Sequence, residues 1–401
     1  MNLAMKPVVL ILAAGLAACA TPAMPPRATT PGSQTCASSE VRVDAAFEGG
    51  AMAHCQAAGP REFDITIRPE DQPINPSPWY AVRLTPQTAG PVQINLLYGD
   101  ARHRYRPKTG PDGDNWTYVD DADVRVSDDR SVAHIRLDLD AAPVFLAGQE
   151  LLTASDYATW MMPYRTRNDL SVSTVGYSLE NRPIEMVTHH PESGRGSVVL
   201  IGRQHPPETT GAVAMQAFVE VVLGSSALAQ EFRSTYGVVI LPLLNPDGVQ
   251  HGYWRHNRGS TDLNRDWGPF AQPETRAARD AIDTLDQSAS TRPVLFLDFH
   301  STNRDVFYTQ PAGEDGTPYR FTGLWLERAG ARLPGYEIER AERHQSDLPT
   351  AKNYMFGRFM IPAITYELGD DTDRALIRQT AAVFAEEMMA ILLDYGLAAA
   401  H

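Results

Sequence analysis

Two buried-type strands, each ending near a residue that can hold a metal, constrain the fold of this chain most. Val198-Val-Leu-Ile201 is typical of a buried strand, and apolar spacing from Ala212 to Leu223 predicts an amphipathic helix. His205 and Glu208 lie in the loop between them. A second apolar run, Val294-Leu-Phe-Leu-Asp-Phe-His300, ends in a histidine. In open α/β sheets ligands gather at the carboxyl edge of the strands, so we expect these three side chains to meet there.

Two histidines and one glutamate form one of the standard ligand sets of catalytic zinc, whose fourth position stays open for water. We therefore expect His205, Glu208 and His300 to hold one Zn²⁺ per chain. A histidine and a glutamate three residues apart are, by themselves, more often surface polarity than a metal site. The rest of the sequence has to decide between these two interpretations.

Further blocks follow in order along the chain. They are Asn245-Pro-Asp-Gly248, Trp254-Arg255, Asp262-Leu-Asn-Arg-Asp-Trp267 and Ile364-Thr-Tyr-Glu-Leu368. Together with the two zinc-ligand segments, this order resembles the zinc carboxypeptidase superfamily over roughly Asp156 to Tyr395. The His-Pro-Pro-Glu-Thr form and a β-rich segment before the catalytic part are similar to the cytosolic carboxypeptidase branch. The expected fold class is α/β, a mixed sheet with helices on both faces.

The resemblance implies a role for each matching residue. Glu367 matches the general base, which takes a proton from water and passes it to the leaving amine. Arg255 matches the arginine that stabilises the developing oxyanion. Arg258 is its rival, and the Trp-Arg pair favours Arg255. Asn264 and Arg265 match the pair that grips the substrate's terminal carboxylate, for which a planar guanidinium is suited.

Two further residues of the region before Glu367 are harder to assign. Tyr354 precedes Glu367 at a shorter spacing than the family's mobile tyrosine, so that role is not carried over. Lys352, in the stretch expected to form the side-chain pocket, can meet an acidic side chain, although a lysine is more often simply solvated.

The resemblance implies zinc-dependent removal of C-terminal residues from peptides that carry a free C-terminal carboxylate. Two enzymatic alternatives remain: a peptidoglycan peptidase that trims the stem peptides of muropeptides, and an acyl-amino-acid deacylase. Deacylases of this superfamily typically show His-Gly-Asn-Glu and lack the Trp-Arg pair. A third alternative is a non-catalytic binding lipoprotein, and the retained zinc ligands, Arg255 and Glu367 count against it.

The amino terminus predicts export. Lys6 precedes an apolar stretch, Pro7 to Leu16, and Leu16-Ala-Ala-Cys19 resembles a bacterial lipobox. We expect residues 1–19 to be a lipoprotein signal peptide, with Cys19 lipidated and the chain anchored in a membrane. Ala20 after the cysteine favours the outer membrane, facing the periplasm. The 35 basic and 49 acidic residues give a net charge of −14, which argues against nucleic-acid binding.

Three segments follow the signal peptide. Residues 20–60 are expected to be a proline-rich tether and a segment in which Cys36 and Cys55 form a disulfide in an oxidising compartment. Short alternating runs over residues 61–148, separated by Pro and Gly, predict a smaller antiparallel β-sandwich. Residues 149–401 are expected to form the catalytic domain, which closes on a helix over residues 372–395.

Overall fold

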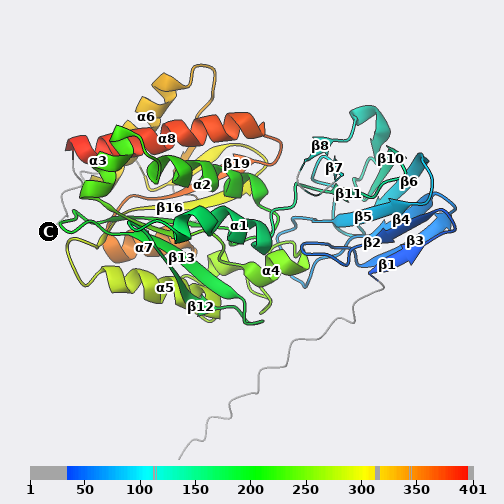
Figure 1. Cartoon of the computed structure of the whole chain (residues 1–401), viewed down its shortest axis with the longest axis horizontal. Helices are drawn as coiled ribbons and strands as arrows, with labels where there is room; N and C mark the ends of the chain where they lie inside the picture. Colours follow the sequence, from blue (N-terminus) through cyan, green and yellow to red (C-terminus); the bar gives the residue numbers. More distant parts are fainter. Residues whose placement is uncertain are drawn as a thin grey trace, which may run out of the picture. The chain divides into compact units, whose positions relative to one another are not determined.

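The computed structural model describes residues 34–111, 113, 115–311, 317–342, 344 and 346–395. The expected signal peptide, the lipidated Cys19 and most of the tether therefore lie outside the described residues. The strands of the described chain form two groups: an amino-terminal group of two sheets, and a second group that is one larger sheet (Figure 1). Among the described residues no single helix is long and apolar enough to cross a membrane.

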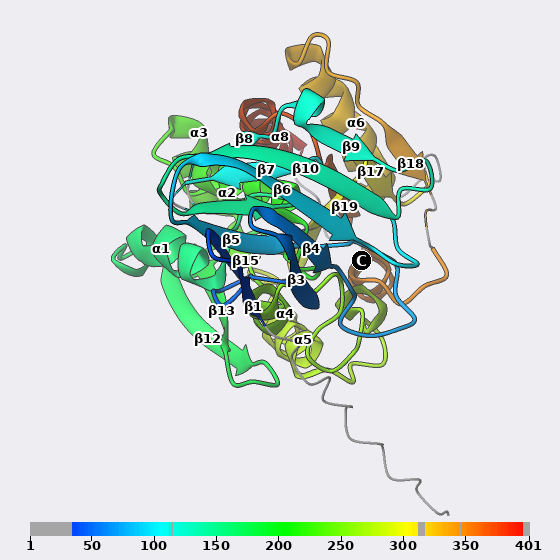
Figure 2. The same cartoon turned by 90° about the vertical axis from the view of Figure 1, so that its right-hand side faces the viewer.

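The amino-terminal group is a β-sandwich, which faces the viewer in Figure 2. Its strands are β1 Thr35–Ala37, β2 Val41–Asp44, β3 His54–Gly59, β4 Glu62–Thr66, β5 Ala81–Pro86, β6 Gly90–Leu97, β7 Lys108–Gly110, β8 Thr117–Tyr118, β9 Val124–Val126, β10 Val132–Leu139 and β11 Val144–Ala147. One sheet has the order β1-β2-β5-β11-β7-β8 and the other β3-β4-β6-β10-β9. In β10, alternate residues from Ala133 to Leu139 are buried, so one face of the strand packs on the core.

The predicted antiparallel sandwich is confirmed apart from one strand pair and from its start: β1, β2 and β3 belong to it although they precede residue 61, where the sequence placed its beginning. Strands β4 and β6 are parallel, whereas the other strand pairs described in the sandwich are antiparallel. The chain leaves β4, forms β5 in the opposite sheet, and returns to β6. Two crossings between the sheets restore the direction of the chain, which explains the parallel pair.

A disulfide joins Cys36 of β1 to Cys55 of β3, with Cα atoms 5.7 Å apart. Because β1 belongs to one sheet and β3 to the other, the bond links the two layers of the sandwich covalently. It does so at the point where the described chain begins.

The second group is an eight-stranded mixed sheet of order β12-β13-β15-β14-β16-β19-β17-β18. Its strands are β12 Ser171–Tyr177, β13 Pro183–His189, β14 Ser197–Gly202, β15 Gly237–Leu241, β16 Pro293–Thr302, β17 Val306–Thr309, β18 Arg340–Glu342 and β19 Ala363–Gly369. The helices are α1 Ala154–Arg165, α2 Thr209–Val222, α3 Ala227–Thr235, α4 Pro246–His251, α5 Pro273–Leu285, α6 Thr317–Arg332, α7 Ala351–Phe359 and α8 Arg374–Tyr395. The central strands β15, β14, β16 and β19 run parallel.

Helices cover both faces of this sheet, as predicted. Side chains of α2, α3, α6 and α8 share one apolar core with the sheet, and those of α5 and α7 share another on the opposite face. Figure 1 shows α2 and α8 on one side of β16, with α5 and α7 on the other. All six residues of β14 are buried, which is typical of a parallel strand covered on both faces.

The prediction that the helix after Glu208 is amphipathic was wrong. Helix α2 begins at Thr209, three residues earlier than the apolar spacing indicated, and is buried on nearly every side. It packs on β16 with one side and on α8 with another. A helix enclosed in this way has little solvent-exposed surface, so its sequence shows little of the polar alternation expected from a surface helix.

Candidate active site

The segment between β14 and α2 carries the first two candidate ligands. Arg203 opens it with a left-handed backbone, φ 54°. Its buried guanidinium donates from Nε and Nη2 to the carbonyl oxygen of Pro206, at 2.9 and 2.7 Å. This buried cation fixes the path of the loop, and with it the positions of His205 and Glu208. His300 reaches the same place from β16.

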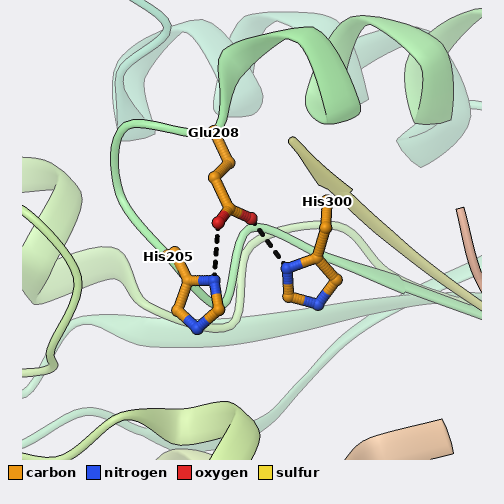
Figure 3. A group of neighbouring side chains, drawn as sticks. All are labelled: His205, Glu208 and His300. Carbon is orange, nitrogen blue, oxygen red and sulfur yellow. Dashed lines mark hydrogen bonds and ion pairs between the residues drawn. The ribbon is translucent and has the colours of Figure 1, made fainter. Parts of the chain in front are cut away.

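The three candidate ligands converge around Glu208 (Figure 3). Nδ1 of His205 lies 2.8 Å from Oε1 of Glu208, and Nδ1 of His300 lies 2.7 Å from Oε2. All three side chains are buried, and their ligand atoms lie within 4.8 Å of one another. Burial alone would raise the pKa of Glu208, but the two imidazoles hold that pKa well below its usual range. The carboxylate is therefore available as a charged ligand.

On the side away from Glu208, each imidazole is oriented by a second carboxylate. Nε2 of His205 lies 2.9 Å from Oδ1 of Asp262, and Nε2 of His300 lies 2.9 Å from Oδ2 of Asp298. Such a partner holds the proton on Nε2 and leaves Nδ1 to face the centre, as in other histidine-ligated metal sites. Sequence reasoning missed both aspartates. The signal for Asp298 was its place two residues before His300, on the same face of a strand whose residues before Asp298 are apolar.

The residues fit a zinc ion by their chemistry. Two imidazole nitrogens and a carboxylate are a common catalytic zinc set, and both nitrogens already face the carboxylate. Glu367 of β19 lies next to His300 of β16 in the parallel register. Its Oε2 is buried without a hydrogen-bond partner among the described residues. Burial has the largest effect on the pKa of this carboxyl group and raises it. His300 lowers the pKa, and the charge of Glu208 raises it further. A carboxyl group of raised proton affinity thus stands beside the ligands.

A pocket opens over these groups. Besides the three ligands and Glu367 its wall contains, from the catalytic part, Arg255, Asn264, Arg265, Ser301, Thr302, Tyr308, His344, Thr350, Lys352 and Thr365, and, from the β-sandwich, Asn75, Ser77 and Arg104. Four cationic side chains therefore surround the candidate metal centre. Such a lining favours substrates that carry negative charge.

Arg255, and not its rival Arg258, reaches the pocket. Nε of Arg255 donates to Oδ2 of Asp262 at 2.8 Å, so Asp262 joins this arginine to the ligand His205. Arg258 instead forms an ion pair with Glu180, also at 2.8 Å, and does not line the pocket.

The predicted carboxylate-binding pair lies beside the ligands. Oδ1 of Asn264 accepts from the backbone N–H of Ala351 at 2.9 Å, and its Nδ2 lies 3.3 Å from Nε2 of His300. Nη1 of Arg265 donates to the carbonyl oxygen of Asn264 at 2.8 Å. Both side chains line the pocket, together with the first turn of α7.

Lys352 is buried in the pocket wall and is not solvated. Only 2% of the residue is exposed, and its Nζ donates to the carbonyl oxygen of His344 at 3.1 Å. It forms no ion pair with a carboxylate of the described chain, and burial lowers its pKa to about 8. An unpaired buried cation that faces a pocket is costly unless a ligand supplies the counter-charge.

The tyrosine that lines the pocket is Tyr308, whereas the sequence analysis considered Tyr354. Tyr354 packs its ring against Trp267 and Phe270 and does not line the pocket. Tyr308 of β17 does line it, with its ring stacked on His344 at 3.9 Å. No motif marks Tyr308, because it enters the pocket through strand pairing alone.

The fold and the site together define an α/β protein with a candidate metal centre, and comparison with known proteins names its family. Residues 159–382, more than half of the chain, match the zinc carboxypeptidase family, and the chain belongs to that family. Cytosolic carboxypeptidase 6 of Caenorhabditis elegans is 29% identical over 162 residues, covering 38% of this chain and 34% of that protein. Cytosolic carboxypeptidase 1 of Xenopus laevis is 34% identical over 136 residues, covering 30% and 11%. The matches thus span about a third or less of these relatives.

Solved structures confirm the predicted fold. A metallo-carboxypeptidase from Burkholderia cenocepacia superposes with a TM-score of 0.73 at 21% identity, covering 88% of this chain and 98% of that one. A metallo-carboxypeptidase from Pseudomonas aeruginosa superposes with a TM-score of 0.72 at 21% identity, covering 87% and 98%. These matches extend over the β-sandwich as well as the catalytic sheet, so the two-part architecture is shared.

Proposed function

We propose that this protein is a zinc-dependent carboxypeptidase, which hydrolyses the peptide bond next to a free C-terminal carboxylate. The observation that carries the proposal is the unpaired Oε2 of Glu367, buried in a pocket beside the three converging ligands. Such an oxygen has no structural task in the described chain. Its task can instead be chemical, because it can accept a proton from a water molecule that lies next to it.

Zn²⁺ held by His205, Glu208 and His300 would supply a Lewis acid and lower the pKa of a bound water. Glu367 accepts a proton from the attacking water at Oε2 and delivers it to the leaving amine. Arg255 donates hydrogen bonds to the oxygen that becomes negative in the transition state, which is where fixed charge accelerates a reaction most. Arg265 and Asn264 hold the terminal carboxylate, and this contact restricts cleavage to the end of the chain.

We further propose that the preferred C-terminal side chain is acidic. Lys352 has no carboxylate partner in the described chain, and its ammonium group lines the same pocket as Arg265. A substrate carboxylate would satisfy it by a charge-assisted hydrogen bond. Peptides with neutral C-terminal residues would leave this cation buried and unpaired, which is unfavourable.

For the location we propose the cell envelope, with a lipid anchor on Cys19 and the catalytic part facing the periplasm. The support is the apolar stretch and the lipobox-like Leu16-Ala-Ala-Cys19 in the sequence. The substrates would then be envelope peptides, with muropeptides as the alternative because an anchored enzyme meets them there.

Mass spectrometry of a mixed library of peptides and muropeptides, incubated with the zinc-loaded protein, tests the function. We expect loss of single C-terminal residues from peptides with a free carboxylate and none from their amidated counterparts. The Glu367→Gln variant should leave the library intact. Equal cleavage of free and amidated peptides would refute the exopeptidase assignment, and release of acyl groups alone would favour the deacylase alternative.

A further inference from the structure

The backbone that carries Arg255 is held by the β-sandwich. Glu70, in the loop that follows β4, accepts hydrogen bonds from three consecutive backbone N–H groups. Its Oε2 lies 2.7 Å from the nitrogen of Trp254, and its Oε1 lies 2.9 Å and 2.6 Å from the nitrogens of Arg255 and His256. Hydrogen bonds to an ionised acceptor are roughly twice as strong as neutral ones. One carboxylate therefore clamps the segment 254–256.

The side chains on either side of Arg255 are also anchored in the sandwich. The indole of Trp254 is 2% exposed and belongs to the apolar core of the β-sandwich, although the residue follows α4 of the catalytic part. Nδ1 of His256 lies 2.6 Å from Oδ1 of Asp71, the neighbour of Glu70. Both flanks of Arg255 are thus fixed to the sandwich, while its own guanidinium reaches Asp262 and the pocket.

A hydrophobic contact would be enough to hold two domains together. A carboxylate that meets three amides does more, since it fixes the direction of the backbone as well as its position. The guanidinium of Arg255 must meet an oxygen whose charge appears only in the transition state. A displacement of about 1 Å in such a group can cost about 100-fold in rate. The placement of the clamp directly at Arg255 therefore bears on the rate.

We propose that Glu70 is a positioning residue for Arg255, and that the β-sandwich is thereby a working part of the active centre. This inference rests on the proposed carboxypeptidase function. Glu70 acts through Arg255 and does not line the substrate pocket. Its loss should consequently lower kcat and leave substrate binding and the metal centre intact.

The test is a double-mutant cycle on the zinc-loaded protein with one good peptide substrate. In Glu70→Gln an amide NH₂ replaces an oxygen opposite N–H donors, so the clamp is weakened at nearly constant volume. We expect kcat to fall about 10- to 100-fold, with KM within about twofold and one zinc per chain. In an Arg255→Ala background the same substitution should cause no further loss. Glu70→Asp, which keeps the charge, should recover part of the rate.

Glu150→Gln is the matched control. It removes a carboxylate that lies just after β11 and pairs with Arg374 at 2.8 Å, away from the clamped segment. It should lower stability and leave kcat unchanged. Hydrogen exchange provides a readout independent of activity: amides 254–256 should exchange faster in Glu70→Gln and Glu70→Asp than in Glu150→Gln.

Unchanged kcat in Glu70→Gln, an equal loss with and without Arg255, or unaltered exchange at amides 254–256 would each overturn the inference. If Glu70→Gln does not fold, Glu70→Asp carries the same comparison. Absence of hydrolysis by the wild-type protein would instead refute the proposed function, and the exchange measurement would still show whether Glu70 holds the segment.

Discussion

Nε2 of His205 lies 2.9 Å from Oδ1 of Asp262. The other oxygen of the same carboxylate accepts from Nε of Arg255 at 2.8 Å. The candidate metal ligand His205 and Arg255, which we propose to stabilise the oxyanion, thus share one anchor. A change in Asp262 should disturb both proposed functions together.

Asp262→Asn should therefore weaken zinc binding about 10- to 100-fold, because a side-chain amide that bonds to Nε2 no longer enforces the required tautomer. Hydrolysis should fall further than the loss of zinc explains, since Arg255 also loses its charged partner. Competition with a chelating dye measures the zinc affinity, and saturating zinc separates the two effects. Asp280→Asn, at an exposed position of α5, is the control. Full activity of Asp262→Asn at saturating zinc would contradict the shared anchor.

Glu367→Gln should lower kcat at least about 100-fold and retain one zinc per chain, because the amide keeps the shape of the side chain but cannot accept the proton. Steady-state hydrolysis together with metal analysis measures both quantities. Glu327→Gln, on the exposed side of α6, should behave as wild type. Persistent turnover in Glu367→Gln would remove it from the role of base.

Lys352→Met tests the acidic pocket. Methionine has a similar length without the charge, so kcat/KM for a peptide ending in glutamate should fall roughly 10- to 100-fold, as expected for a lost charge-assisted hydrogen bond. The same peptide ending in alanine is the internal control and should be cleaved as well as before or better. A wild-type preference for basic or aromatic C-terminal residues would contradict the assignment.

Glu274 gives a pH dependence of stability. Its Oε2 accepts from Asn257 at 2.9 Å, its Oε1 is buried without a partner in the described chain, and burial raises its pKa from 4.5 to about 7. A carboxyl group whose pKa is higher in the folded state stabilises the fold when it is protonated. Its contribution is complete below pH 4.5 and is lost as the pH rises to about 7, a change of about 3 kcal/mol in the free energy of unfolding.

Glu274→Gln should keep the bond from Asn257 and remove this dependence. Chemical denaturation should then show a difference between variant and wild type that widens from pH 4.5 to 7 and stays constant above. Stability curves that remain parallel over this range would show that the carboxyl group is not perturbed.

How much of the site could be predicted depends on how locally each residue is determined. His205 and Glu208 follow the apolar strand β14, and His300 lies near the carboxyl end of the apolar strand β16. The carboxyl ends of these two parallel strands meet at one edge of the sheet. The contact between Glu70 and Arg255 spans 185 residues of sequence and depends on how the loop after β4 packs, which no local pattern encodes. Tyr308 was missed for the same reason.

The remaining differences between the sequence predictions and the structure concern burial. Lysine is normally solvated, so the enclosed position of Lys352 could not be inferred from its neighbours in sequence. The same holds for α2, whose burial depends on α8, a helix more than 150 residues further along the chain. Sequence patterns report whether one face of an element is apolar, and they do not report how many partners will cover it.

The bond between Cys36 and Cys55 has a mechanical consequence. It links the first strand of one sandwich layer to the first strand of the other, and Cys36 lies close after Gln34, where the described chain begins. A force applied to the chain before Gln34 would act on this covalent bridge before β1 could separate from its sheet. Both sheets would then share the tension. The clamp on Arg255 belongs to the same sandwich, so the bridge would also limit the tension that reaches Arg255 through β1.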